Sequence, residues 1–348
     1  MTTTRPKQAG YTMPAEWGAH ALVYLAWPSA ANLWLDNLPA AQDEFVAFCT
    51  AVADCDASGA ARGERMKVLV PTIQDGATAE KRLQGLPVSI ELQLFGDIWL
   101  RDTAPLFLKN LKGEKAFARA AFNGWGEKYN LPGDPDLALR IGESSGYLKF
   151  ETDWVLEGGS VELDGEGTCL TSRQCLLNPN RNLGRGEAEV ETFLKDWLGC
   201  EKVLWLNDGL LNDHTDGHID TMARYVGPGV IACMQAEDRT DPNFEVMDQI
   251  AKDLSGMTDA RGRKIKVERV VSPGSILNED GDVMPASYLN FYIANTTIVV
   301  PTYGSSQDAE AVRQIAALFP ERRTVGLSAR AILTGGGAFH CMSQQEPV

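Results

Sequence analysis

The sequence of 348 residues predicts an α/β fold in which one unit, a β-hairpin followed by a helix and a further strand, repeats around a propeller-like ring. Two observations predict it. Apolar residues recur at helical spacing in several places, each time ahead of a short apolar run, and pairs of extended segments lie between these places. Because no linker or low-complexity stretch interrupts the pattern, residues 1–348 are expected to form a single domain.

The first element in chain order is a buried strand at 19–27, which Pro28 closes. The segment 131–136 is rich in Pro, Gly and Asp and is interpreted as a surface loop. Helix-strand units are predicted at 40–57 with 67–71, 186–198 with 202–206, 243–255 with 265–271, and 308–319 with 323–327. Hairpins are predicted at 104–108 with 116–122, 160–163 with 168–171, 221–226 with 230–234, and 288–294 with 297–300.

The amino-acid composition limits the classes of molecule that the protein is expected to bind. Lys and Arg number 32 against 47 Asp and Glu, a net charge of −15, which disfavours nucleic acid and favours a small cation. No run of about 18 apolar residues is present, and residues 1–10 have no apolar core of the signal-peptide kind. The seven cysteines are irregularly spaced and include no CxxC pair, which is typical of reduced thiols and not of structural zinc. We therefore expect a cytoplasmic protein without a membrane partner.

Cys341 is a candidate nucleophile because it closely follows three glycines, which allow a ligand to approach the backbone. A buried structural cysteine is the alternative. Asp102, Glu157, His218 and Asp220 lie where predicted hairpins begin. Since equivalent positions in a ring of repeated units converge, we expect these side chains to meet Cys341 near the axis. Each of them alone could equally be a local cap, turn or core residue.

The histidines are few and their spacing is informative. If 218–220 is a strand, His218 and Asp220 face the same side, whereas the adjacent His340 and Cys341 face opposite sides. His218 is therefore the expected partner of the thiol, and His340 is given no role. His214 and His218 have a spacing that could serve a metal, but 212–217 is interpreted as a loop and we expect no metal. Dinucleotide-binding and phosphate-loop motifs are missing, so no cofactor is expected either.

Short motifs in a fixed order extend over nearly the whole chain. They are Met13-Pro14-Ala15-Glu16-Trp17, Asp97-Ile98-Trp99-Leu100-Arg101-Asp102, Asn123-Gly124-Trp125-Gly126, Glu157-Gly158-Gly159-Ser160, Asn178-Pro179-Asn180-Arg181-Asn182, Asp216-Gly217-His218-Ile219-Asp220, Pro285 through Tyr292, and Gly335 through Gln345. Together they resemble the agmatine deiminase family of the guanidino-group-modifying penteins, which is related to bacterial peptidylarginine deiminases. Ala104 and Glu127 each stand where the family pattern has a glycine.

The resemblance implies a five-bladed α/β propeller of ββαβ units with its active site on the pseudo-fivefold axis. It implies Cys341 as nucleophile, His218 as general acid and base with Glu157 as its partner, and Asp102 and Asp220 as the carboxylates that hold the guanidinium. The implied reaction converts agmatine to N-carbamoylputrescine and ammonia through a Cys thiouronium, a step of polyamine biosynthesis or agmatine catabolism. Further substrate contacts are expected from Trp99, Arg101, Asp213, Asp216, Asn290, Gly336 and Gly337.

Three alternatives stay open at this point. The substrate could be arginine or a peptidylarginine side chain, which carries no free amine at its far end. A wall that recognises the amine of agmatine should be acidic or aromatic, and its candidates are Glu16, Trp17, Trp99, Asp213 and Asp216. The remaining hypotheses are a catalytically silent module that binds guanidino or other cations, and a zinc hydrolase. A homodimer is compatible with each of the three.

Overall fold

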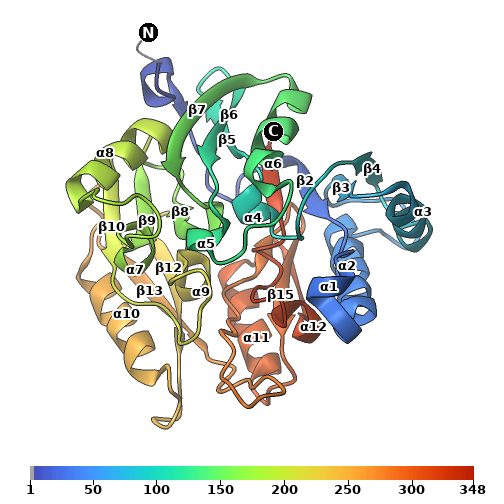
Figure 1. The fold of residues 1–348 in the computed structure, drawn as a ribbon. Helices are drawn as coiled ribbons and strands as arrows, with labels where there is room; N and C mark the ends of the chain where they lie inside the picture. Colours follow the sequence, from blue (N-terminus) through green and yellow to red (C-terminus); the bar gives the residue numbers. More distant parts are fainter. Residues whose placement is uncertain (1–3) are drawn as a thin grey trace.

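The computed structural model describes residues 4–348 and contains five small β-sheets around a ring (Figure 1). Residues 1–3, the start of the segment expected to lack a targeting signal, lie outside the described part. In every sheet an antiparallel strand pair is followed, after a helix, by a strand that adds in parallel. This repeated ββαβ unit confirms the predicted five-bladed α/β propeller.

The ring is closed by strands from the two ends of the sequence. β17 (Gln344–Pro347) pairs antiparallel with β2 (His20–Ala26), which places Gln344 opposite Tyr24. Helix α2 (Leu38–Ala53) then leads to the parallel strand β3 (Met66–Val70). Helix α3 (Ile73–Arg82) and strand β4 (Val88–Leu92) extend this sheet by one more parallel strand, and the sequence did not predict them.

The other four blades follow in chain order. The second contains β5 (Leu106–Asn110), β6 (Lys115–Ala121), α6 (Asp134–Ser145) and β7 (Leu148–Val155), with β1 (Tyr11–Thr12) at its edge. The third contains β8 (Val161–Leu163), β9 (Thr168–Ser172), α8 (Glu187–Leu198) and β10 (Lys202–Leu206). The fourth contains β11 (Ala223–Gly227), β12 (Val230–Gln235), α10 (Phe244–Gly256) and β13 (Lys266–Val271). The fifth contains β14 (Tyr292–Ile293), β15 (Thr297–Thr302), α11 (Asp308–Leu318) and β16 (Arg323–Ser328).

Helices α2, α8, α10 and α11 lie toward the outside of the ring in Figure 1. Each is amphipathic, and in α2 the apolar face buries Phe45, Phe48 and Val52 against the sheets. All four predicted helix-strand units are confirmed to within a few residues. Among residues 4–348, none of the helices combines the length and the apolar composition needed to cross a membrane.

Short helical turns precede the inner strands of several blades and carry the residues that face the axis. They are α4 (Leu100–Thr103), η3 (Gly158–Ser160) and α9 (Ile219–Met222). The short helix α12 (Arg330–Leu333) precedes Gly335 through Gly337 and packs into the hydrophobic core. Further short helices are η1 (Lys7–Ala9), α1 (Ala31–Trp34), η2 (Leu35–Asn37), α5 (Gly124–Glu127) and α7 (Arg173–Leu176).

Three local predictions are wrong. The segment 131–136 is only partly loop, because α6 begins at Asp134 and tolerates Pro135 in its first turn, where no backbone donor is lost. Residues 288–291 form turns and not a strand, so β14 is limited to Tyr292–Ile293. Residues 218–220 are not a strand either: His218 caps α9 and Asp220 lies within it.

Candidate active site

Cys341 lies in a turn directly before β17, and Asn290 holds it there. The Asn290 Nδ2 donates to the Cys341 Sγ at 3.0 Å, and the Asn290 Oδ1 accepts from the backbone N–H of Cys341 at 3.2 Å. The thiol itself donates to Asp220 Oδ2 at 3.4 Å. A single amide side chain thus fixes both the sulfur and its main chain, and the thiol is buried but 7% exposed toward a cavity.

Asp102, His218 and Asp220 converge on Gly159, as their placement before separate hairpins predicted. A methyl group on Gly159 would lie 2.6 Å from His218 Nδ1, 3.0 Å from Asp102 Oδ1 and 3.2 Å from Asp220 Oδ2. The backbone N–H of Gly159 donates to Asp102 Oδ1 at 2.8 Å, and Trp125 Nε1 donates to Asp102 Oδ2 at 2.9 Å. Only glycine leaves room for three functional side chains at this point.

Glu157 lies beneath His218, as expected for a partner of the histidine. His218 Nε2 is 3.7 Å from Glu157 Oε2, and His218 Nδ1 is 3.7 Å from Asp102 Oδ2. Arg181 Nε donates to Glu157 Oε1 at 2.7 Å, and both side chains of this pair are completely buried. Neither ring nitrogen of His218 has a hydrogen-bond partner among the described residues.

The electrostatics assign distinct protonation states to these groups. Burial alone lowers the pKa of His218, but Asp102 and Glu157 outweigh it and raise that pKa well above its usual range. Burial raises the pKa of the Cys341 thiol well above its usual range, and the charges of Asp220 and Asp102 add to this. The free site therefore holds an imidazolium and a neutral thiol at neutral pH.

The two carboxylates differ. Burial raises the pKa of Asp102, with a further contribution from the charges of Glu157 and Asp220. Burial also acts to raise the pKa of Asp220, but the hydrogen bond and charge of His340 outweigh it and bring the value down to about 2. Asp220 is therefore ionised at neutral pH.

A cavity of about 180 Å³ opens above the thiol. Cys341, Asp102 and Gly335 through Gly337 line its inner part, and Trp99, Trp125, Tyr129 and His214 form much of its walls. A methyl group on Gly337 would lie 2.6 Å from the Trp99 ring and 3.2 Å from the Cys341 Sγ, so glycine is needed there for the ring and the sulfur to approach. The cavity is narrow, aromatic and acidic at its base.

Only some of the further substrate contacts that the sequence predicted line the cavity. Trp99, Gly336 and Gly337 line the cavity, and Asn290 contacts the thiol from behind. Asp213 accepts from the backbone N–H of His218, so it supports that residue and does not line the cavity.

Arg101 and Asp216 also lie behind the cavity wall. Arg101 donates to the carbonyl of His340 at 3.4 Å and to Gln344 Oε1 at 3.0 Å. Asp216 accepts from Arg181 Nη1 at 2.8 Å and pairs with Lys128 at 2.6 Å. Both residues brace the site and neither lines the cavity.

The predicted amine-recognising wall needs correction. Of its five candidates only Trp99 lines the cavity; Glu16 is buried against Arg224 and His340, and Trp17 packs on Tyr225. Asp97 does line the cavity, but Trp34 Nε1 and Trp99 Nε1 each donate to one of its oxygens at 2.9 Å. Burial raises the pKa of Asp97. The wall is thus aromatic in character.

Sequence reasoning missed Gly159, Trp125 and His340. Gly159 and Trp125 stood within quoted motifs, and their contacts with Asp102 could not be inferred from spacing alone. His340 was set aside on the assumption of a strand, yet residues 339–342 form a turn and His340 Nδ1 lies 2.7 Å from Asp220 Oδ2. The alternation of side chains along a strand does not apply in a turn.

Two buried groups contain side chains that could together hold a metal ion. They are Glu157 with Cys175 and His218, and Glu16 with Glu162 and His340. In the first group Arg181 already balances Glu157, and in the second Arg224 pairs with both glutamates. Protein cations therefore already pair with the carboxylates in both places. His214, the other candidate ligand, is exposed and lies 3.1 Å from the Tyr129 hydroxyl.

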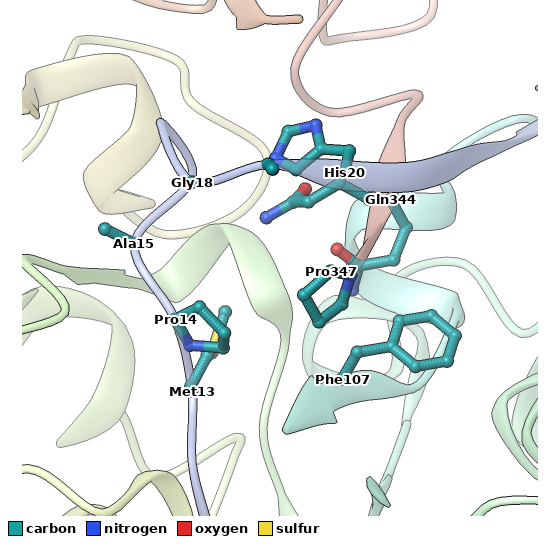
Figure 2. A pocket seen from close by; sticks show the side chains of 10 residues that line it. Met13, Pro14, Ala15, Gly18, His20, Phe107, Gln344 and Pro347 are labelled. Atoms are coloured by element: carbon teal, nitrogen blue, oxygen red, sulfur yellow. The ribbon is translucent and has the colours of Figure 1, made fainter. Parts of the chain in front are cut away.

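A second hollow, of about 20 Å³, lies between the N-terminal segment and the last strand (Figure 2). Met13, Pro14 and Ala15 face Gln344 and Pro347 across it. Its volume suits one water and not a substrate, and its lining contains none of the five predicted catalytic residues.

The family model of the Porphyromonas-type peptidyl-arginine deiminases matches residues 12–347. The chain belongs to this family. An agmatine deiminase from Ectopseudomonas mendocina is 34% identical to it, over 99% of this chain and 98% of the relative. The solved agmatine deiminase of Enterococcus faecalis is 32% identical, with a TM-score of 0.92 over 100% of this chain and 98% of its own.

A solved agmatine deiminase of C. jejuni with substrate bound is 25% identical to this deiminase-family chain, with a TM-score of 0.86 over 97% of this chain and 96% of its own. These likenesses extend over the full ring and identify the propeller as the pentein fold. Membership in the family makes the chain a guanidino-group hydrolase.

Proposed function

We propose that the protein hydrolyses agmatine to N-carbamoylputrescine and ammonia through a covalent thiouronium on Cys341. The observation that carries this proposal is the meeting of a thiol, two carboxylates and a buried imidazole at the base of one cavity. Cys341 and Asp102 line that cavity, and Asp220 and His218 lie directly behind them. The full-length relatives named agmatine deiminases support agmatine as the substrate.

Binding of the guanidinium falls to Asp102 and Asp220. A guanidinium stays protonated at ordinary pH, and its planar fork of donors matches carboxylate acceptors. Asp220 Oδ1 has no partner among the described residues. The other oxygen of this carboxylate, Oδ2, and Asp102 Oδ1 lie 3.2 and 3.0 Å from the position that a methyl group on Gly159 would take, so the two carboxylates meet at one point. Paired hydrogen bonds that the guanidinium N–H groups donate to these carboxylates would hold the central carbon against the sulfur.

Substrate binding also activates the nucleophile. The raised pKa of the Cys341 thiol reflects burial beside two carboxylates, and a bound guanidinium neutralises exactly those charges at short range. The thiol then loses its proton to solvent and the thiolate attacks the guanidinium carbon. Asn290 Nδ2 stabilises the developing thiolate through its hydrogen bond to the sulfur.

His218 carries the proton transfers. The tetrahedral adduct receives a proton from the His218 imidazolium on its departing nitrogen, ammonia leaves, and a cationic thiouronium remains on Cys341. The neutral imidazole next removes a proton from water, which attacks the same carbon. Collapse of the second adduct breaks the carbon-sulfur bond, and the hydroxyl proton passes to the departing sulfur. This step releases the neutral ureido product and regenerates the Cys341 thiol and the His218 imidazolium. Because Glu157 and Asp102 favour the imidazolium, the acid is present at neutral pH.

The test is a product screen. We expect the wild type to release ammonia from agmatine with a higher kcat/KM than from arginine or a blocked arginyl peptide. Cys341→Ser should lose at least about 10³-fold of this activity, while Cys55→Ser, at a half-buried thiol away from the cavity, should keep it. Equal turnover by Cys341→Ser and wild type would refute the nucleophile.

Two other outcomes separate the alternatives. A preference for the arginyl peptide would move the protein to the activity that its family is named for. Ammonia release from none of these guanidines would leave a binding module for cations. A cytoplasmic location, a homodimeric assembly and a place in polyamine metabolism stay predictions, which cell fractionation, sedimentation and metabolite analysis would test.

A further inference from the structure

His340 lies between two carboxylates on the axis of the ring. Its Nδ1 is 2.7 Å from Asp220 Oδ2, its Nε2 is 2.7 Å from Glu16 Oε2, and the residue is 1% exposed. An ionised carboxylate can only accept hydrogen bonds, so the ring donates through both nitrogens and carries a positive charge. The arrangement gives this neighbour of the nucleophile a defined task.

The effect on Asp220 is directional. Its Oδ2 accepts from both His340 and the Cys341 thiol, whereas its Oδ1 has no partner among the described residues. His340 therefore determines which oxygen faces the sulfur and which one is left for the substrate. Its charge also opposes the cost of keeping an ionised carboxylate in a fully buried place.

Glu16 anchors the other side of the imidazole. The backbone N–H of Ile293 donates to Glu16 Oε1 at 2.9 Å, and Arg224 Nη2 donates to Glu16 Oε2 at 2.5 Å. Arg224 also pairs with Glu162 at 3.1 Å. Glu16 belongs to the N-terminal segment that faces β17 in Figure 2, so a residue far from the nucleophile in sequence supports its surroundings.

We propose that His340 is a positioning residue of the deimination reaction, which holds Asp220 ionised and oriented for the guanidinium while Glu16 fixes the far side of its ring. This inference rests on the proposed function, because Asp220 has a substrate to hold only if a guanidine binds. His340 does not touch the reacting atoms and acts through Asp220 alone.

Several charges surround this pair and belong to any account of its pH dependence. His218, Asp102 and the Cys341 thiol face Asp220 from the neighbouring blades. Glu16, Glu162, Arg101 and Arg224 surround His340. Of these groups, His340 is the positively charged one that is hydrogen-bonded to Asp220.

The experiment replaces the imidazole in two separate variants and measures kcat/KM for agmatine as a function of pH. His340→Asn retains a donor near the Nδ1 position without the charge, and His340→Ala removes both. We expect losses at pH 7 of about tenfold for His340→Asn and about 10²-fold for His340→Ala, expressed mainly in KM. The acid limb should move to higher pH, because Asp220 without its cation binds a proton more readily as the pH falls.

His20→Asn is the matched control. His20 is also buried and bonded to a carboxylate, with its Nδ1 2.8 Å from Glu64 Oε1. Its Nε2 lies 2.7 Å from the backbone carbonyl of Glu16 and does not contact the Glu16 carboxylate that holds His340. This variant should lower Tm and leave the pH profile in place. If the two His340 variants lose Tm as His20→Asn does and keep the wild-type acid limb, His340 is only structural and the inference is overturned.

A binding measurement separates this inference from the proposed function. In the Cys341→Ser background, calorimetry measures the Kd of agmatine with His340 intact and with His340→Asn added. At least tenfold weaker binding upon His340→Asn supports the positioning role even if the wild type releases no ammonia. Unchanged binding together with an unchanged pH profile contradicts it while leaving the deimination reaction intact.

Discussion

Gly159→Ala tests the convergence of the site at one point. The added methyl group would lie 2.6 Å from His218 Nδ1, whereas ordinary contacts at such a carbon begin at 3.4 Å. The imidazole must therefore move by about 0.8 Å, or the backbone at 159 must move with Asp102, which its N–H holds at 2.8 Å. Gly159 does not have a left-handed φ, so alanine imposes no backbone strain of its own.

A displacement of this size in a catalytic group costs about 10²-fold in rate, equivalent to about 2.7 kcal/mol of transition-state stabilisation. We expect Gly159→Ala to lose about this much in kcat/KM for agmatine while its circular dichroism spectrum matches that of the wild type. Gly256→Ala is the control, because a methyl group at Gly256 meets no atom within 4 Å.

The assay is ammonia release at saturating and subsaturating agmatine, with Tm measured on the same samples. If Gly159→Ala keeps kcat/KM within threefold of the wild type and remains folded, the tight meeting of His218, Asp102 and Asp220 is irrelevant to catalysis. The reasoning from close contact to function would then be wrong.

Three further predictions follow from single contacts. Glu157→Gln should move the alkaline limb of kcat by about one pH unit to lower pH. The reason is that the acid form of His218 is lost as the pH rises through its pKa, which Glu157 helps to raise. A pH-rate profile with an unmoved alkaline limb would count against the pairing of Glu157 with His218. Asn290→Ala should reduce kcat/KM by about 10-fold or more, because the Cys341 Sγ loses its 3.0 Å hydrogen-bond donor. The rate of iodoacetamide alkylation, measured against pH, should show a higher pKa of the Cys341 thiol in this variant. Trp125→Phe should cost about tenfold in kcat/KM with little change in Tm, because it removes only the 2.9 Å donor to Asp102; wild-type kinetics would show that this bond is dispensable.

The ring and most of its helices could be predicted from the sequence because their patterns are local. Each helix-strand unit is recognised from the spacing of apolar residues within its own segment, and the unit at 186–198 with 202–206 is a clear example. Helix α6 was missed because Pro135 and its flanking Gly133 resemble a turn, although a proline in a first helical turn is compatible with both structures.

The proposed catalytic residues could be found as members of motifs, but their supporting contacts could not. Asp102, Glu157, His218, Asp220 and Cys341 all meet as expected. The pairing of His340 with Asp220 depends on a turn whose geometry no periodicity indicates. In the same way, Arg101 was expected to contact the substrate, yet its side chain donates to Gln344 on the seam of the ring.

The pairing of β17 with β2 makes the active site depend on the seam between the two ends of the sequence. Cys341 lies directly before β17, and the backbone N–H of Arg101 donates to its carbonyl, so separation of the seam strand would move the proposed nucleophile away from Asp220. The remaining four sheets share no strand with this seam and could keep their structure. Under mild denaturant, enzymatic activity should therefore disappear while most of the helical signal persists, and a ligand that bridges Cys341 and Asp220 should act as a clamp that delays opening.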